Sequence, residues 1–152
     1  MFRIATDNDC DAVYRMICDM EAKTLSYDVF KLIYQKQAED ARYECIICEE
    51  AQEIVGFINL RYEEQLHHAG MIAEIMEFVI DSGYRSKGYG SKILGYACRR
   101  AREKGCIQIE AACNQLRKDT HRFYLREGMK NYHFKFSMGL TGREPEGNVL
   151  GR

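Results

Sequence analysis

A glycine-rich, basic loop separates an apolar run from a helical pattern near the middle of the chain. Its sequence is GYRSKGYGSK, residues 83–92, and it follows closely on the apolar residues 78–80. Successive amide N–H groups at a helix N-terminus form a concave anion site, and glycine lets phosphate oxygens approach the backbone. Arg85 and Lys87 add positive charge. The loop therefore predicts a phosphate-binding turn, although a plain strand-to-helix turn would use the same glycines.

Two common nucleotide-binding motifs do not fit this loop. A Rossmann fingerprint would need a third glycine three positions beyond Gly90, where the chain has Ile93. A Walker A motif would need a lysine directly after its second glycine, but Tyr89 follows Gly88. What remains is a strand, a cationic glycine loop and a helix that begins near Ser91.

The composition is that of a globular chain. The 152 residues, 46% of them hydrophobic and 30% charged, suffice for one domain with a full core. A net charge of −1 gives no reason to expect nucleic acid or an anionic membrane as a partner. No apolar run approaches the roughly 18 residues of a membrane span, and the start of the chain turns polar too early for a signal peptide. We therefore expect a cytoplasmic protein.

Seven cysteines invite a search for metal or redox chemistry. Most fall singly among apolar neighbours, where free cysteine behaves as a small hydrophobe. Only Cys45 and Cys48 have a metal-like spacing, and residues three apart in a strand point to opposite faces. No second cysteine pair accompanies them. The sequence thus predicts reduced core cysteines and no metal site.

The spacing of apolar residues divides the chain into strands and helices. Strands are predicted near residues 2–5, 43–48, 54–60, 71–80, 107–113 and 132–140, and helices near residues 8–22, 26–38, 91–104 and 118–126. Their order, β-α-α-β-β-β-α-β-α-β, indicates a three-layer α/β fold with a mixed central sheet. We expect one domain over residues 1–140, followed by a polar, frayed tail over residues 141–152.

The loop and its surroundings resemble the GNAT superfamily of N-acetyltransferases. The pattern Arg85-x-x-Gly88-x-Gly90, after Glu77-Phe78-Val79-Ile80, is similar to the acetyl-CoA signature of that family. The block FYLREGM, residues 123–129, resembles the family's late helix that bears a tyrosine. The resemblance implies a GNAT-type fold and an acetyltransferase that uses acetyl-CoA.

Further blocks resemble the bacterial aminoalkylphosphonate N-acetyltransferases. They are DAVYRMICDMEA (11–22), LHHAGMIAEIMEFVI (66–80), THRFYLREG (120–128) and HFKFSMGL (133–140). These blocks are less diagnostic than the glycine loop, because related acetyltransferases share parts of them. The resemblance implies a small primary amine as the acetyl acceptor.

The resemblance also implies where the acetyl donor binds. In this family the pantetheine arm pairs with the strand that precedes the loop, and the pyrophosphate lies on the loop itself. Strand amides near Val79 could also hold the acetyl oxygen as it becomes an oxyanion, and such donors are worth roughly 3–4 kcal/mol each. Asn114 lies where family members often contact CoA, although it could equally be a turn residue. The implied cofactor-binding residues are Phe78, Val79, Ile80, Arg85, Ser86, Lys87, Gly88, Tyr89, Gly90, Ser91 and Asn114.

The implied reaction is the direct attack of a neutral amine on a thioester. An alkylamine is mostly protonated at neutral pH, so a base must take its proton. Glu74 and Glu77 are the candidates, and the resemblance of AEIMEF favours Glu74, acting through water. On a regular strand the two would face opposite sides, and a bulge, which this family's central strand usually carries, would change that. Either carboxylate could instead be a solvated strand residue.

Tyr124 is the candidate acid. The CoA thiolate that leaves has a thiol-like pKa of about 8.5, and a phenol at about 10 can return a proton to it. The alternative is that Tyr124 packs the last helix against the sheet beside Phe123, as aromatic residues at helical spacing usually do. The FYLREG resemblance favours the acid.

Two adjacent histidines, His67 and His68, lie in a loop before the proposed catalytic strand. If the acceptor bears a phosphonate, they could donate to it together with arginine side chains, or a divalent metal could bridge to it. A solvated pair of loop histidines is the plain alternative. The residues assigned to substrate binding are His67, His68, Glu77 and Arg122.

The expected function is therefore an acetyl-CoA-dependent N-acetyltransferase for a small primary amine such as an aminoalkylphosphonate. A second interpretation changes the acceptor to a cationic amine: an aminoglycoside, a polyamine or a protein amine. A third is a CoA-binding module without turnover, against which the presence of both Glu74 and Tyr124 argues. No nucleic acid or membrane partner is expected, and a homodimer is plausible for this family.

Overall fold

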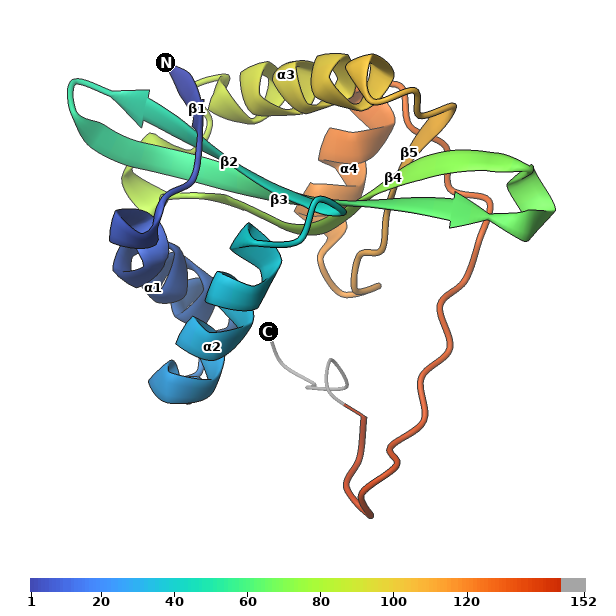
Figure 1. Cartoon of the computed structure of the whole chain (residues 1–152), viewed down its shortest axis with the longest axis horizontal. Helices are drawn as coiled ribbons and strands as arrows, with labels where there is room; N and C mark the ends of the chain where they lie inside the picture. Colours follow the sequence, from blue (N-terminus) through green and yellow to red (C-terminus); the bar gives the residue numbers. More distant parts are fainter. Residues whose placement is uncertain (146–152) are drawn as a thin grey trace. The chain divides into compact units, whose positions relative to one another are not determined.

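The computed structural model describes residues 1–145, which belong to two compact units (Figure 1). The first unit is Met1–Ala111, and the second begins at Ala112. The sheet of the first unit has five strands: β1 (Phe2–Ile4), β2 (Tyr43–Glu50), β3 (Glu53–Gln65), β4 (Gly70–Ile80) and β5 (Gln108–Ala111). Its helices are α1 (Cys10–Glu21), α2 (Tyr27–Ala38) and α3 (Tyr89–Glu103), with 3₁₀ turns η1 (Asp7–Asp9), η2 (Leu66–His68) and η3 (Ser82–Tyr84).

The sheet of the first unit is covered on both faces, by α1 and α2 on one side and by α3 on the other (Figure 1). Strands β1 to β4 pair antiparallel in the order of the chain, and β5 pairs parallel with β4. These layers confirm the predicted α/β class and mixed sheet. The order of elements is also confirmed as far as helix α4 (Lys118–Arg126) of the second unit.

Helix α1 buries one apolar side against the sheet. Val13 and Met16 form a core cluster with Ile47, Phe57 and Val79, which come from three successive strands. The helix ends where Ala22 adopts a left-handed conformation, with φ of 52°. Helix α2 buries none of its residues fully, and Phe30 and Tyr34 pack at the margin of the same cluster. The first layer is therefore anchored mainly through α1.

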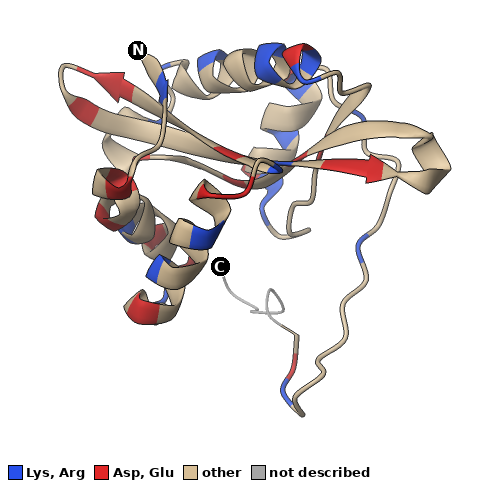
Figure 2. Cartoon of the chain, viewed as in Figure 1, with Lys and Arg blue, Asp and Glu red and all other residues tan. Residues whose placement is uncertain are grey.

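Helix α3 lies close to the opposite face. Gly56 of β3 permits this approach, because a Cβ there would lie 2.7 Å from the Val79 carbonyl oxygen and 3.2 Å from Cδ1 of Ile93. Basic residues lie along α3, as Figure 2 shows, and Arg100 is in the last turn of this helix. Arg100 donates to both oxygens of the buried Glu44 carboxylate, at 2.7 and 2.9 Å. This pair ties the C-terminal half of α3 to β2.

A β-bulge interrupts the pairing of β3 with β4. Asn59 lies opposite Glu77, but the next residue, Leu60, lies opposite Ile75. Met76 is therefore an extra residue in β4. Because side chains alternate between faces along a strand, one extra residue reverses the alternation beyond it.

The second unit holds helix α4 and a segment without helix or strand. The strand expected over residues 132–140 is not formed. Its apolar side chains do alternate, but a strand also needs a neighbour for its backbone hydrogen bonds, and alternation alone does not provide one. These side chains are between 78% and 91% exposed: Tyr132, Phe134, Phe136, Met138 and Leu140. The expected single domain over residues 1–140 stays a prediction, and the end of the expected tail, residues 146–152, lies outside the described residues.

The cysteines found in the structure are free thiols, with Cys10 and Cys48 buried. Over residues 1–145, no group of three or more His, Cys, Asp or Glu side chains has an arrangement that could hold a metal ion. In the same part of the chain, no helix has both the length and the apolar character needed to cross a membrane.

Candidate active site

The loop between β4 and α3 is held by its own side chains. Arg85 Nε donates to the Ile80 carbonyl at 3.1 Å, and Lys87 Nζ donates to the Gly83 carbonyl at 2.8 Å. Ser86 and Gly88 have positive φ angles of 60° and 84°. Glycine adopts that conformation at no steric cost, which explains Gly88 as the residue that precedes the helix.

Helix α3 begins at Tyr89, so Gly90 and Ser91 lie in its first turn rather than before it. The N-terminal end of a helix presents backbone N–H groups and a positive dipole end. The loop thus brings together the residues expected to bind the pyrophosphate, Arg85 to Ser91. Arg85 and Lys87 stabilise the conformation of the loop through their hydrogen bonds, and they also give the loop its positive charge.

Strand β4 extends beyond its pairing with β5. The last register pair of the two strands is Ile75 with Ala111, and β4 continues to Ile80. The Asp81 N–H donates to the Val55 carbonyl of β3. In an antiparallel pair of strands, hydrogen-bonded residue pairs recur at every second residue. The N–H of Val79, which lies opposite Phe57, therefore also faces β3. An oxyanion donor on the outer edge of β4 must therefore be a neighbour of Val79 rather than Val79 itself.

Two rows of polar residues cross the sheet on the face covered by α1 and α2. The first row is Cys45, Asn59 and Glu77, and the second is Tyr43, Arg61, Glu74 and Glu110. Asn59 contacts Gln37 of α2, which fixes the face, and Arg61 is two residues further along the same strand. The bulge at Met76 therefore places Glu74 and Glu77 on one face.

The two candidate bases have different surroundings. An oxygen of Glu74 accepts from a guanidinium nitrogen of Arg61 at 2.7 Å, and about 29% of the Glu74 side chain is exposed. Glu77 is more enclosed, and an oxygen of its carboxylate accepts from Nδ2 of Asn59 at 2.8 Å. Burial raises the pKa of Glu77, and the nearby charge of Glu21 acts in the same direction, while the Asn59 hydrogen bond opposes the shift.

Glu110 is the third carboxylate on this face. It lies beside Glu74 in the register of β4 with β5, and its Oε1 is buried without a hydrogen-bond partner in the described part of the chain. Nε of Arg61 is likewise buried without a hydrogen-bond partner among residues 1–145. Two buried polar atoms near Glu74 thus lack a hydrogen-bond partner within the described residues.

The two histidines lie apart from these rows. His67 and His68 form turn η2 at the tip of the β3–β4 hairpin, with their ring centroids 4.2 Å apart. Four strand positions separate Gly70 from Glu74, which corresponds to about 13 Å along an extended strand. The structure brings Glu74, Glu77 and Arg61 together, and it does not bring the histidines to them.

The expected site residues of the second unit have their own contacts. Asn114 accepts from the Leu116 N–H through its side-chain oxygen, at 2.9 Å, in the turn before α4. Arg122 pairs with Asp119 one helical turn away. Burial raises the pKa of Tyr124 to about 12.

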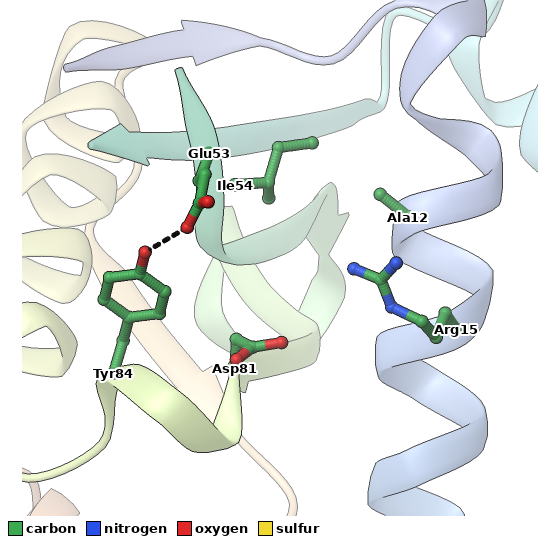
Figure 3. A pocket seen from close by; sticks show the side chains of 6 residues that line it. All are labelled: Ala12, Arg15, Glu53, Ile54, Asp81 and Tyr84. Carbon is green, nitrogen blue, oxygen red and sulfur yellow. Dashed lines mark hydrogen bonds between the residues drawn. The ribbon is translucent and has the colours of Figure 1, made fainter. Parts of the chain in front are cut away.

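A separate shallow pocket of about 380 Å³ lies beside the first turn of α1 (Figure 3). Its lining side chains are Ala12, Arg15, Glu53, Ile54, Asp81 and Tyr84, and the Tyr84 hydroxyl donates to the Glu53 carboxylate. Neither the pocket nor the residues Asn59, Gln37 and Glu110 were expected from the sequence. The one sequence signal for Asn59 is an amide inside the apolar run GFINL.

The family model for the acetyltransferase (GNAT) family matches residues 10–129. The chain belongs to the GNAT family. It is an N-acetyltransferase by this membership and by its similarity to the aminoalkylphosphonate N-acetyltransferase of Salmonella typhimurium. That protein is 38% identical over 138 residues, which cover 91% of this chain and 90% of the Salmonella protein. GNAT enzymes use acetyl-CoA as the acetyl donor.

Solved structures agree with this GNAT fold. A transcriptional regulator from Bacillus halodurans has a TM-score of 0.84 at 25% identity, covering 91% of this chain and 98% of that one. Glucosamine-6-phosphate N-acetyltransferase from Arabidopsis thaliana has a TM-score of 0.75 at 18% identity, covering 92% and 97%. At that identity the second likeness shows the fold alone. The predicted family and fold are confirmed.

Proposed function

We propose that this GNAT enzyme transfers an acetyl group from acetyl-CoA to the primary amine of a small molecule, with Glu74 as the general base. The observation that carries the proposal is the bulge at Met76, which aligns Glu74 and Glu77 on one face beside the end of the β4–β5 pairing. Glu74, which would accept the proton, and Glu77, which would bind the ammonium group, then lie next to the edge of β4 on which acetyl-CoA is expected.

The donor is assigned to β4 and the loop that follows it. The pantetheine arm extends along residues 78–80, beyond the last register pair with β5. The pyrophosphate lies on residues 85–91, where glycine conformation and the helix N-terminus favour an anion. Asn114 contributes a side-chain amide. The site thus holds acetyl-CoA by backbone groups more than by charged side chains.

The reaction then proceeds in one displacement. Glu74 accepts a proton from the acceptor's ammonium group through water, and Glu77 binds that group before it is deprotonated. The amine nitrogen forms a bond to the acetyl carbon and gives a tetrahedral oxyanion. As this intermediate collapses, the C–S bond breaks, the electron pair leaves with the CoA sulfur, and the extra proton on the nitrogen passes to solvent. N–H groups on the outer edge of β4 stabilise the oxyanion between these events.

Tyr124 is assigned to the leaving sulfur. With a pKa of about 12, its phenol stays protonated at neutral pH and can donate to the thiolate. Full transfer to a thiolate of pKa about 8.5 is uphill. Tyr124 therefore acts chiefly as a hydrogen-bond donor that stabilises the thiolate until solvent protonates it.

An aminoalkylphosphonate is the first acceptor to test, because the Salmonella relative bears that name. With its amine at Glu74, a two-carbon aminophosphonate would end well short of the histidines, about 13 Å along the strand. Arg61, whose side chain is 30% exposed, is a nearer cation for the phosphonate. His67 and His68 would suit a longer acceptor.

A cationic amine is the second candidate. Glu63, Glu74, Glu77 and Glu110 come from the same stretch of sheet, and Arg61 is the cation with which two of them pair. An excess of carboxylates favours a polyamine or an aminoglycoside over an anion.

Product analysis by mass spectrometry decides between these acceptors. The protein would be incubated with acetyl-CoA and aminomethylphosphonate, 2-aminoethylphosphonate, a polyamine, an aminoglycoside or a lysine peptide. Acetylated phosphonate is the expected product. Acetylation of only a cationic amine would keep the reaction and refute the phosphonate, and no product with any amine would refute the proposed function.

A further inference from the structure

Asn59 is a buried polar residue in an otherwise apolar stretch of β3. Only 8% of it is exposed, and Ile58 and Leu60 beside it are fully buried. Its side-chain nitrogen donates both to Oε1 of Gln37, at 2.9 Å, and to Oε2 of Glu77, at 2.8 Å. One amide thus joins helix α2 to the carboxylate at the bulge. A buried amide is costly unless it is bonded, so this arrangement is strongly specified.

The bond from Asn59 falls at the irregular position of the sheet. Asn59 and Glu77 form the last register pair before Met76 interrupts the ladder. A bulge loosens the backbone locally, because the extra residue has no opposite partner. The side-chain bond compensates by fixing the Glu77 carboxylate directly to Asn59 of strand β3.

The charged and titratable groups around Glu77 do not favour its ionised form, as Asn59 does. Glu21 at the end of α1 acts on Glu77 as a like charge, and Cys45 of β2 is a neutral thiol whose own pKa is raised. Gln37 of α2 is neutral and bonds to Asn59. Burial favours the protonated form of Glu77, and the Asn59 N–H is the neighbour that favours the ionised form.

We infer that Asn59 is a positioning residue that holds the Glu77 carboxylate at the bulge to receive the acceptor's ammonium group. This inference rests on the proposed function, in which Glu77 binds the amine. Gln37 in turn orients Asn59, so helix α2 takes part in acceptor binding without touching the acceptor.

The pH dependence of kcat/KM for the amine tests this role. Asn59→Ala removes a hydrogen bond to a charged group, which should move the acidic limb of the profile up by about one pH unit. On the acidic side of the limb the KM for the amine should rise roughly tenfold, with the KM for acetyl-CoA and kcat little changed. Asn59→Asp, which faces Glu77 with a second carboxylate, should shift the limb further in the same direction.

Matched variants separate positioning from a general loss of structure. Gln37→Ala should give a smaller shift of the same sign, because the bond from Asn59 to Glu77 remains. Gln35→Ala, on the exposed side of the same helix, should give none. In a Glu77→Gln background, Asn59→Ala should leave the pH profile unchanged. An acidic limb that stays in place in Asn59→Ala and Asn59→Asp, with kcat falling instead, would overturn the inference.

A readout without activity keeps the two proposals distinct. The folded protein binds the Glu77 proton more tightly than the unfolded chain, so this group lowers stability as pH rises from its ordinary pKa to its folded pKa. Asn59→Ala should extend that fall in Tm to higher pH, and Glu77→Gln should abolish the contribution of this group. If no amine is acetylated but this pattern holds, the proposed function fails while the Asn59–Glu77 coupling stands. If amines are acetylated and Asn59→Ala changes neither profile, the inference about Asn59 fails alone.

Discussion

Arg61 and Glu74 face each other across β3 and β4, with a guanidinium nitrogen 2.7 Å from a carboxylate oxygen. The pair is partly exposed, so water reaches the proposed base while the arginine fixes its direction. Glu63 lies further from the same guanidinium, at 3.8 Å. This arrangement makes Glu74 an oriented carboxylate at the accessible end of the polar face.

Glu74→Gln should lower kcat by about a hundredfold or more, because the amide cannot accept the amine proton. Single-turnover measurements at saturating acetyl-CoA and amine would check this. Arg61→Met should lower kcat less, and Arg61→Lys should recover part of the loss. Glu63→Gln is the matched control on the same strand and should stay within a few-fold of the original rate. Equal effects of Glu63→Gln and Glu74→Gln would contradict the assignment of the base.

Tyr124→Phe should keep the fold and lower kcat about tenfold or more, since the CoA sulfur loses its hydrogen-bond donor. The raised pKa also sets a pH expectation: the phenol loses its proton only near pH 12, so this residue should produce no basic limb at lower pH. Steady-state rates across the alkaline range, with an acceptor whose own titration is known, would test both points. Tyr132→Phe, at a tyrosine that is 79% exposed, is the control. Unchanged turnover in Tyr124→Phe would remove the tyrosine from the mechanism.

Gly90→Val should abolish acetyl-CoA binding, because its side chain would occupy space that the pyrophosphate needs at the first turn of α3. Isothermal titration with acetyl-CoA would measure the loss. Gly95→Ala in the same helix has open space for its Cβ and should stabilise the protein by about 1 kcal/mol without changing cofactor affinity. Retained affinity in a folded Gly90→Val protein would refute the donor site.

Asp9→Asn should destabilise the first unit by about 2 kcal/mol, since the buried carboxylate accepts two hydrogen bonds from Arg3. These bonds hold the pKa of Asp9 below its ordinary value, so its contribution is present above about pH 4 and is lost as pH falls through the folded pKa. The Tm of Asp9→Asn should therefore be lower at neutral pH, and the gap should close in acid. Asp7→Asn, which removes an exposed charge, should show no such gap. A gap that is constant with pH would contradict this account.

The glycine loop and helix α3 could be predicted because local chemistry decides them: Gly88 needs a positive φ, and the apolar residues of α3 repeat at helical spacing. The bulge could not be derived from periodicity, because Met76 is a residue type that a regular strand also accepts. Asn59 was missed for a related reason, since its partners Gln37 and Glu77 are distant in sequence and only pairing of the strands brings them close. The segment 132–140 shows the opposite error, in which an alternating pattern predicts a strand without supplying its neighbour.

Because β4 contains a single extra residue, the sequence spacing of its two carboxylates indicates whether the strand is regular or bulged. Glu74 and Glu77 share a face at a separation of three only because Met76 is inserted between them. Deleting Met76 would restore regular alternation and move one carboxylate to the side of α3, although both would still be present in the sequence. In a related chain, two acidic residues separated by two positions would share a face on a regular strand, and those separated by three would do so only on a bulged one. The length of that interval would therefore sort related acetyltransferases into those with a regular catalytic strand and those with a bulged one.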